Sequence, residues 1–306
     1  MVKGIGPAFI KRNLTRIMSD NDCLSLISEK KPDQVDYIPQ LSAEAETIIA
    51  DCKSEEIEMI SIISSDYPKR LFEISDPPCI LYLKGNKALL DKSMAIIGTR
   101  RSTAFGNKIA EKLGEYFSKK YAICNGLVEG IDEHSIYVDG TVLSNVVGII
   151  SGGLCYKETC SKTHVKVIED VLSASGLIIS EYAPHTKEDQ FSGSKASRIQ
   201  AGLSKGLILV QSSVDGGSKY TIASFAKLGR AMGIVHYPAS NEYMSDSFSA
   251  NRLIVEKKNE GVAEIINLKS TSKLNISSIT IIESKNDYAA FSHQMDKTSQ
   301  ALNFGF

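Results

Sequence analysis

Short apolar runs alternate with longer amphipathic segments from about residue 61 to residue 268. The short runs are rich in Ile, Val and Leu, as strands buried on both faces of a sheet should be. These runs cover 93–97, 121–124, 145–150, 177–180, 207–211 and 233–236. Helical spacing of apolar residues fills the intervals 104–120, 130–138, 161–174, 195–203 and 219–232. The alternation predicts βαβ crossovers and an α/β fold, with a doubly wound, mostly parallel sheet and helices on both faces.

The segment before this region, residues 1–60, has a different pattern and predicts a small helical domain. Leu14, Ile17 and Met18 recur at helical spacing, and a second helix is predicted over 42–52. The Pro-containing stretch at 30–33 reads as a turn between helices. We therefore place a domain boundary near residue 60.

The segment after this region, residues 269–306, becomes polar and forms a tail without an assigned role. It contains a short strand-like run at 279–282 and a possible helix over 287–302. Three alternatives stay open for this tail, namely a docked helix, an oligomer contact or a mobile end. The predicted domains are thus 1–60, 61–268 and 269–306.

Composition and charge fit an ordinary globular protein. The chain has 306 residues, 42% of them hydrophobic and 23% charged, with a formal net charge of -1. This balance argues against a uniformly basic surface but allows a local basic groove. No run approaches the roughly 20 apolar residues that span a bilayer, and the first residues lack a signal-peptide core. The six cysteines form no C-x-x-C pair, so we expect reduced thiols and no zinc site. Together with the lack of a membrane-spanning run, this predicts a cytoplasmic location and no membrane partner.

The loop after the first predicted strand of the sheet is the strongest candidate for binding chemistry. Gly98, Thr99, Arg100 and Arg101 follow the apolar run directly, and Thr103 stands where a helix cap is expected. A helix N-terminus offers unpaired N–H groups and a positive dipole end to an anion. Glycine lets a ligand approach the backbone, and arginine adds bidentate hydrogen bonds to phosphate. The loop predicts a phosphate site, although Arg101 could equally be a surface charge.

Three further loops after predicted strands share this character. The second contains Asn125 and Gly126, the third leads to Phe191 and Arg198, and the fourth contains Gly217, Ser218 and, in the following helix, Thr221. Glycine beside Ser, Thr or Asn at such junctions creates nests of backbone donors. Each glycine alone could serve only a tight turn, but repetition across one sheet favours a phosphate-binding edge. Phe191 is either a loop core residue or a platform for a base, and Arg198 could be a surface charge.

Known catalytic motifs are missing from the sequence. It contains no G-x-S-x-G elbow, no Walker A lysine motif and no metal-type histidine pair. The G-x-G-x-x-G fingerprint does not follow the key strand, which argues against an ordinary dinucleotide cofactor. We therefore predict a binding module without a cofactor or metal rather than an enzyme.

The ordered set of loops resembles the DprA/Smf family of DNA-processing proteins, within a wider Rossmann-like group that includes the LOG-type phosphoribohydrolases. The resemblance covers roughly residues 61–256. It rests on segments that occur in family order: 67–68, 76–78, 95–100, 125–127, 130–132, 180–182, 198–204, 217–218 and 229–230. The Gly-Ile-Gly-Pro sequence at 4–7 is similar to the helix-hairpin-helix or SAM-like module of many relatives, although a plain turn between helices is an alternative.

This resemblance implies sequence-independent binding of single-stranded DNA, loading of a RecA-type recombinase in DNA uptake and recombination, and a homodimer. The DNA contacts that it implies, together with those from the loops themselves, are Gly98, Thr99, Arg100, Arg101, Asn125, Gly126, Phe191, Arg198, Gly217, Ser218 and Thr221. Three departures weaken the match. Glu129 adds a negative charge to the second loop, Ala196-Ser197-Arg198 replaces an Arg-Asn-Arg run, and Gln211 replaces an acidic residue. The departures suggest a divergent member, in a defence or mobile-element setting as one hypothesis.

Two other functions compete with DNA binding. A nucleotide sensor would use the same phosphate-binding loops for a small signalling molecule. A LOG-like hydrolase would cleave a nucleotide N-glycosidic bond, and its Pro-Gly-Gly-x-Gly-Thr-x-x-Glu motif is nearest to residues 215–223 here. The glycines and Thr221 are present in this stretch, but no glutamate follows them. The sequence therefore favours DNA binding over hydrolysis.

Overall fold

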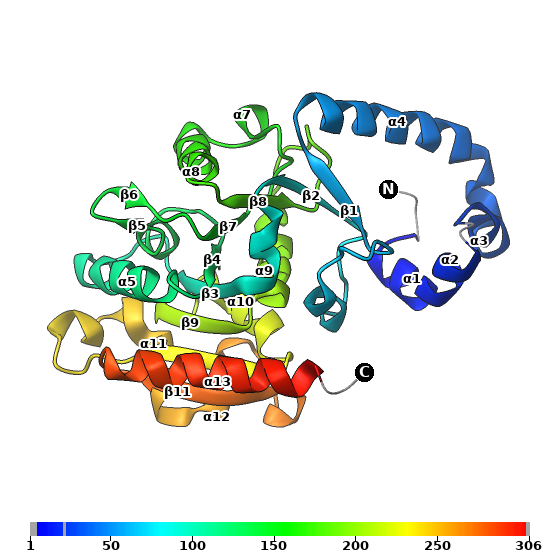
Figure 1. Ribbon diagram of the computed structural model, residues 1–306. Helices are drawn as coiled ribbons and strands as arrows, with labels where there is room; N and C mark the ends of the chain where they lie inside the picture. The colour runs from blue at the N-terminus through cyan, green and yellow to red at the C-terminus, as the bar shows by residue number, and fades with distance from the viewer. Residues whose placement is uncertain (1–4, 21–22, 304–306) are drawn as a thin grey trace.

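A nine-stranded sheet forms the centre of the protein in the computed structural model, which describes residues 5–20 and 23–303 (Figure 1). The strand order is β1-β2-β8-β7-β4-β3-β9-β10-β11. The strands are β1 Glu58–Ser61, β2 Ile80–Gly85, β3 Ser93–Gly98, β4 Ala122–Asn125, β7 Val146–Ile149, β8 Leu177–Ser180, β9 Gly206–Gln211, β10 Arg230–Val235 and β11 Ile276–Ile282. Neighbours from β8 to β11 pair in parallel, whereas β1 with β2, and β2 with β8, pair antiparallel. The predicted α/β fold with a mostly parallel sheet is confirmed.

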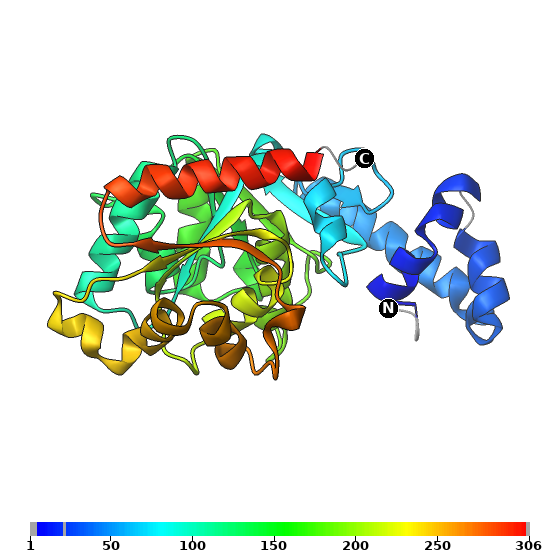
Figure 2. The same cartoon turned by 90° about the horizontal axis from the view of Figure 1, so that it is seen from below.

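Helices cover both faces of this sheet, as doubly wound connections require (Figures 1 and 2). The first face carries α5 Ala104–Phe117, α8 Lys162–Ser173 and α13 Asn286–Asn303. The opposite face carries α9 Ser192–Leu203, α10 Ser218–Phe225, α11 Ser249–Lys257 and α12 Asn259–Ile265. Shorter elements are α6 Ile131–His134, α7 Tyr156–Thr159, the hairpin β5 Tyr137–Val138 with β6 Thr141–Val142, and the 3-10 turns η2 Lys69–Glu73, η3 Lys87–Lys92, η4 Asn241–Met244, η5 Asp246–Phe248 and η6 Thr271–Lys273.

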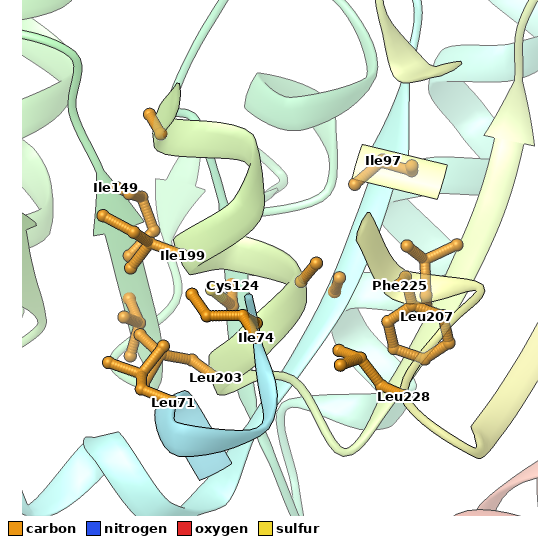
Figure 3. Packing of buried hydrophobic residues seen from close by; sticks show 14 of the residues in the cluster. Leu71, Ile74, Ile97, Cys124, Ile149, Ile199, Leu203, Leu207, Phe225 and Leu228 are labelled. Carbon is orange, nitrogen blue, oxygen red and sulfur yellow. The ribbon is translucent and has the colours of Figure 1, made fainter. Parts of the chain in front are cut away.

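The core lies in two apolar layers, one on each face of the sheet. Because β3, β4, β7, β8, β9 and β10 are buried on both faces, their side chains enter both layers. Figure 3 shows the second layer, where Leu71, Ile199, Leu203 and Phe225 pack against the sheet. Each such side chain contributes roughly 1.5–3 kcal/mol of burial free energy. The two layers fix the strands, and with them the positions of the loops that follow each strand.

The N-terminal helices form a unit beside the sheet (Figure 2). They are α1 Pro7–Arg12, α2 Leu14–Asp20, α3 Cys23–Lys30, the 3-10 turn η1 Pro32–Tyr37 and α4 Ile38–Ser54. Lys11 ties this unit to the remainder of the chain, because its ammonium donates to the carbonyls of Phe72 at 2.9 Å and Ile74 at 2.7 Å. The helical character predicted for this region is confirmed, with α4 longer than the predicted helix over 42–52. Gly4 of the Gly-Ile-Gly-Pro sequence lies outside the described residues.

The C-terminal segment joins the sheet instead of leaving it. β11 pairs in parallel with β10, and α13 packs through Tyr288, Phe291 and Met295 on the first face. The predicted strand and helix are confirmed, with the strand beginning three residues earlier than expected. Because this segment supplies a sheet strand and core side chains, the docked helix is the alternative that the structure supports. The domain boundaries at 60 and 268 stay predictions.

Two predicted helices were too long. The helix expected over 219–232 ends at Phe225, because the positive φ of Gly229 and its hydrogen bond to the carbonyl of Asn275 start a strand instead. The helix expected over 130–138 stops at His134, because Asp139 and Gly140, both at positive φ, turn the chain into the β5–β6 hairpin. The antiparallel strands β1 and β2 were missed altogether.

Candidate nucleic-acid interface

Two of the candidate loops, those after β3 and β9, lie where the sheet changes its direction of winding. From β3 the chain proceeds through β4, β7 and β8 on one side, then crosses to β9, β10 and β11 on the other. β3 and β9 are neighbouring strands, and the loops that follow them lead to helices on opposite faces of the sheet. We call the edge at which the parallel strands end the carboxyl edge, and the opposite one the amino edge. Ligands of open α/β sheets bind in the crevice outside the carboxyl edge, at such a switch point.

Backbone hydrogen bonds and close packing hold the loop after β3 in place. The Thr99 N–H donates to the carbonyl of Gln211 at 2.8 Å, and the Arg101 N–H donates to the Thr99 hydroxyl at 3.2 Å. A Cβ on Gly98 would lie 2.4 Å from Ile131 and 2.8 Å from the same Gln211 carbonyl, so only glycine fits there. Arg100 and Arg101 are exposed and have no ion-pair partner within the described part of the chain. Their guanidinium groups are available to an anionic ligand.

Helix α5 begins directly after this loop. The Thr103 hydroxyl accepts the Gly106 N–H at 3.1 Å, which confirms the predicted cap. The Gln211 side-chain carbonyl accepts the Thr103 N–H at 3.1 Å and lies where a Cβ on Gly106 would stand. Gln211 is fully buried, and its amide nitrogen has no hydrogen-bond partner. Gln211, which in the sequence stood out only because it replaces the family's acidic residue, thus joins the β3 and β9 loops.

The loop after β4 uses its polar residues to hold itself together. Asn125 is fully buried; its amide donates to the Asp132 carbonyl at 2.9 Å and its oxygen accepts the Leu127 N–H at 2.9 Å. Asp132 accepts the Gly126 N–H at 2.9 Å. Glu129 is exposed at the tip of the loop. Asn125 therefore positions the loop from within, whereas Gly126 is half-buried at the carboxyl end of β4.

Asp132 is a buried acid whose pKa is raised to about 7, because burial disfavours its charge more than the Gly126 N–H and Arg100 favour it. A folded-state pKa above the unfolded one means that stability is lost as pH rises through this range. We expect the free energy of unfolding to fall between about pH 4 and about pH 7, by up to about 1.4 kcal/mol per pH unit, through this group. Urea unfolding of the wild type and Asp132→Asn across this range checks the expectation. An unchanged difference between the two proteins at every pH would contradict it.

The loop after β8 places Arg198 differently from the expected phosphate contact. Its guanidinium forms a bidentate pair with Glu181, at 2.7 Å for both bonds, and a further bond to Asp76 at 2.8 Å. It also donates to the Lys195 carbonyl at 2.7 Å. The side chain is only 10% exposed. The alternative of an exposed surface charge is wrong, and the donors expected for phosphate are engaged within the protein, where they lock α9 to the β8 loop and to residues 76–78.

Exposed aromatic rings flank the carboxyl edge. Phe191 is 59% exposed at the start of α9, so it is not a core residue. Tyr220, which the sequence reasoning missed, is 51% exposed in the first turn of α10, with the Lys219 ammonium 5.8 Å from its ring centroid. Exposed aromatic rings with cations beside them suit nucleobase stacking. The sequence did point to Tyr220, because this aromatic residue lies two positions after Ser218, at the start of a predicted helix.

The loop after β9 combines open backbone with buried hydroxyls. Gly217 has open space around the position of a Cβ, which leaves room for a ligand against the backbone. Ser218 is buried and its hydroxyl has no hydrogen-bond partner. Thr221 lies deeper, with its hydroxyl 3.5 Å from the Gln200 side-chain oxygen. Gly217 and Ser218 thus face the crevice, whereas Thr221 supports the packing between α9 and α10.

Neither a metal-type cluster nor a membrane-spanning helix is present among residues 5–20 and 23–303. No group of three or more His, Cys, Asp or Glu side chains in these ranges is arranged to hold a metal ion. No helix in them is long and apolar enough to cross a bilayer. His164, which lies near Gly126 and Arg100, has a lowered pKa because its ring is buried.

Comparison with known proteins identifies related sequences. The family model described as DNA recombination-mediator protein A matches residues 58–271. DNA processing protein DprA of Bacillus subtilis is 31% identical over 196 residues, which are 63% of this chain and 65% of that protein. DprA of Streptococcus pneumoniae is 30% identical over 171 residues, 56% of this chain and 60% of that protein. The matches thus span less than two thirds of either relative.

Solved structures show the same fold. The X-ray structure of DprA from Streptococcus pneumoniae matches with a TM-score of 0.61 at 23% identity, covering 79% of this chain and 77% of that one. A DprA structure from Helicobacter pylori matches with a TM-score of 0.56 at 24% identity, covering 65% of this chain and 87% of that one. At these identities the likeness shows the fold alone, while the family model covers well over half of the sequence. The chain therefore belongs to the DNA recombination-mediator protein A family, to which the DprA and Smf proteins also belong.

Proposed function

We propose that this protein binds single-stranded DNA, without reading its sequence, along the carboxyl edge of the sheet, and that it assists a RecA-type recombinase. The observation that carries the proposal is that two unpaired arginines, a helix N-terminus and exposed aromatic rings all follow the carboxyl ends of strands of one sheet. Arginines and backbone N–H groups bind phosphates, and aromatic rings stack bases of any identity. The Helicobacter pylori relative is described as binding single-stranded DNA.

The structure divides the predicted contact residues into two groups. We propose direct contacts with DNA for positions that are at least partly exposed, which are Gly98, Thr99, Arg100, Arg101, Gly126, Phe191, Gly217 and, in addition, Tyr220, and for Ser218, whose buried hydroxyl has no hydrogen-bond partner in the described part of the chain. We propose supporting roles for Asn125, Arg198 and Thr221, whose side chains are buried and bonded within the protein. Because Ala196 and Ser197 supply no cation beside Arg198, we propose the β3 loop as the main phosphate contact in this chain.

Several partner and location assignments belong to the same proposal. The family's description as a recombination mediator supports assistance of a recombinase, action without catalysis, and a cytoplasmic location. We also propose a homodimer, on the strength of the resemblance stated above. The LOG-like alternative finds no support in the β9 loop, because no glutamate follows Thr221 at the motif spacing.

The β3 loop gives the direct test. Arg100→Ala/Arg101→Ala is expected to weaken binding to an oligothymidylate by about tenfold or more at low salt, because two charge-assisted phosphate contacts are lost. The slope of log affinity against log salt concentration should also fall, by about 0.7 for each lost contact. A filter-binding titration over a range of salt concentrations measures both quantities.

A matched control removes the same charge from the amino edge. Lys119 and Lys227 are exposed, have no ion pair among the described residues, and follow α5 and α10 at the far side of the sheet. Lys119→Ala/Lys227→Ala should therefore bind nearly as tightly as the wild type. Equal losses in both double variants would show only a general charge effect. Stabilisation by one mononucleotide, with no affinity for any oligonucleotide, would favour the nucleotide sensor instead.

A further inference from the structure

A cavity of about 270 Å³ lies beside the proposed DNA groove, between α5 and the start of α13. Both ribbon views place these two segments next to each other, and the rings of Tyr116 on α5 and Tyr288 on α13 lie 5.0 Å apart (Figures 1 and 2). The cavity opens at the ends of β10 and β11, where Val235 and Ile282 contribute to its lining. Its volume approaches the lower bound of roughly 300 Å³ for small-molecule pockets.

The lining of this cavity is aromatic and aliphatic. Phe105 and Tyr237 meet edge to face with ring centroids 5.4 Å apart, and Tyr237 is 37% exposed. Tyr288 is buried and also lines the cavity. Aromatic rings that meet at an angle leave a ring face open to a planar guest. A cavity of this size and lining suits one nucleobase.

The rim of the cavity is positively charged. Lys108 and Lys112 stand one helical turn apart on α5; both are exposed, and neither has an ion-pair partner in the described ranges of the chain. No acidic residue lines the cavity. Asp287, the acid next to it, accepts hydrogen bonds from the N–H groups of residues 283 and 284. The nearby carboxylate of Glu283 is paired with the His236 imidazole at 2.7 Å.

We propose that this cavity receives a nucleobase of the bound DNA strand, with the adjoining phosphates on Lys108 and Lys112. The inference rests on the proposed function, since the strand must first lie along the carboxyl edge. Phe105 follows the Thr103 cap of α5 by only two residues, so the cavity continues the groove around the N-terminus of this helix. Ile282, Ser284 and Tyr288 lie beyond residue 271, where the family match ends. The cavity is therefore a feature that the C-terminal segment of this chain completes.

Photocrosslinking tests the placement directly. An oligothymidylate of about 16 nucleotides, long enough for a groove of this kind, carries 5-iodouracil at one position at a time. We expect crosslinks to Phe191 or Tyr220 from central positions, and crosslinks to Tyr237 from positions nearer one end. Peptide mass spectrometry identifies the crosslinked residue. Crosslinks confined to Phe191 and Tyr220, with normal DNA affinity, would overturn the inference and leave the proposed function intact.

Affinity measurements with variants give a second test of the proposed base-binding cavity. Tyr237→Ala should weaken binding of the same oligonucleotide about fivefold or more, since one stacked base is lost. Lys108→Ala/Lys112→Ala should lower the salt slope by about 1.4, while Lys119→Ala/Lys227→Ala should not change it. Thermal melting confirms that each variant is folded. Unchanged affinity in the cavity variants overturns the inference alone, whereas a wild type without salt-sensitive DNA affinity overturns the proposed function with it. Binding of free thymidine monophosphate as tight as that of the strand would also overturn the assignment.

Discussion

Replacing Arg230 with methionine is expected to lower the free energy of unfolding by about 3 kcal/mol or more, because buried backbone carbonyls and the partly buried Glu73 carboxylate lose their donor. Arg230 is 1% exposed at the start of β10. Its guanidinium donates to the carbonyls of Gly202 at 2.8 Å and Ser204 at 2.6 Å, and pairs with Glu73 at 2.7 Å. Methionine fills similar space but leaves these acceptors buried without donors. Urea unfolding followed by circular dichroism measures the loss.

The control for this prediction is the same substitution at a less buried arginine. Arg252 also donates to two backbone carbonyls, those of Tyr243 and Ser245, but the first of these bonds is only partly buried and the second is exposed. Water can replace the lost donors there, so Arg252→Met should cost no more than about 1–1.5 kcal/mol. Arg230→Lys should be intermediate, because an ammonium keeps the charge but reaches fewer acceptors. Equal losses at positions 230 and 252 would show that burial of the carbonyls does not set the cost.

Arg230 also explains why stability and DNA binding can be separated in this fold. It joins the C-terminal end of α9 and the η2 turn to the first residue of β10, all at the amino edge. The proposed DNA contacts lie at the carboxyl edge, at the opposite ends of the same strands. Variants of Arg230 that remain folded should therefore keep their affinity for DNA.

The sheet was predictable from the sequence because its strands are buried on both faces. Continuous apolar runs such as 93–97 and 207–211 have few alternatives when turn residues and amphipathic segments bound them. The antiparallel strand β1 at the edge was less visible. β1 has the burial pattern exposed, intermediate, buried, intermediate, so its four residues lack a continuous apolar run. The parallel pairing of these strands followed from their alternation with helices, whereas the order of the strands in the sheet was not predicted.

The roles of single polar residues were less predictable, because they depend on partners far away in the sequence. The bonds of Arg198 to Asp76 join residues 122 positions apart, and the Thr103 N–H finds its acceptor in Gln211, 108 positions away. Nothing in the local sequence distinguishes an arginine that binds phosphate from one that holds two loops together. The exposed Arg100 was predictable by contrast, since its loop directly follows a buried strand and precedes a helix.

Replacing Gly130 with alanine is expected to weaken DNA binding by about tenfold or more and to lower the free energy of unfolding by about 2 kcal/mol or more. Gly130 has φ +84° and caps α6 in the loop after β4. A Cβ there would lie 2.4 Å from the carbonyl oxygen of Thr99 and 2.6 Å from that of Arg100. The added methyl group must displace the β3 loop, and the arginines with it. Filter binding at a temperature where the variant is folded measures the effect on DNA.

Gly140 supplies the control that separates backbone strain from this contact. Its φ of +75° is similar, but nothing lies within 4 Å of the position of a Cβ. Gly140→Ala therefore adds strain in the β5–β6 hairpin without touching the β3 loop, and it should destabilise the protein while leaving DNA affinity nearly unchanged. The difference in DNA affinity between the two variants isolates the dependence on the position of Arg100 and Arg101. Wild-type affinity in folded Gly130→Ala would show that DNA binding does not require the β3 loop to be held against the β4 loop.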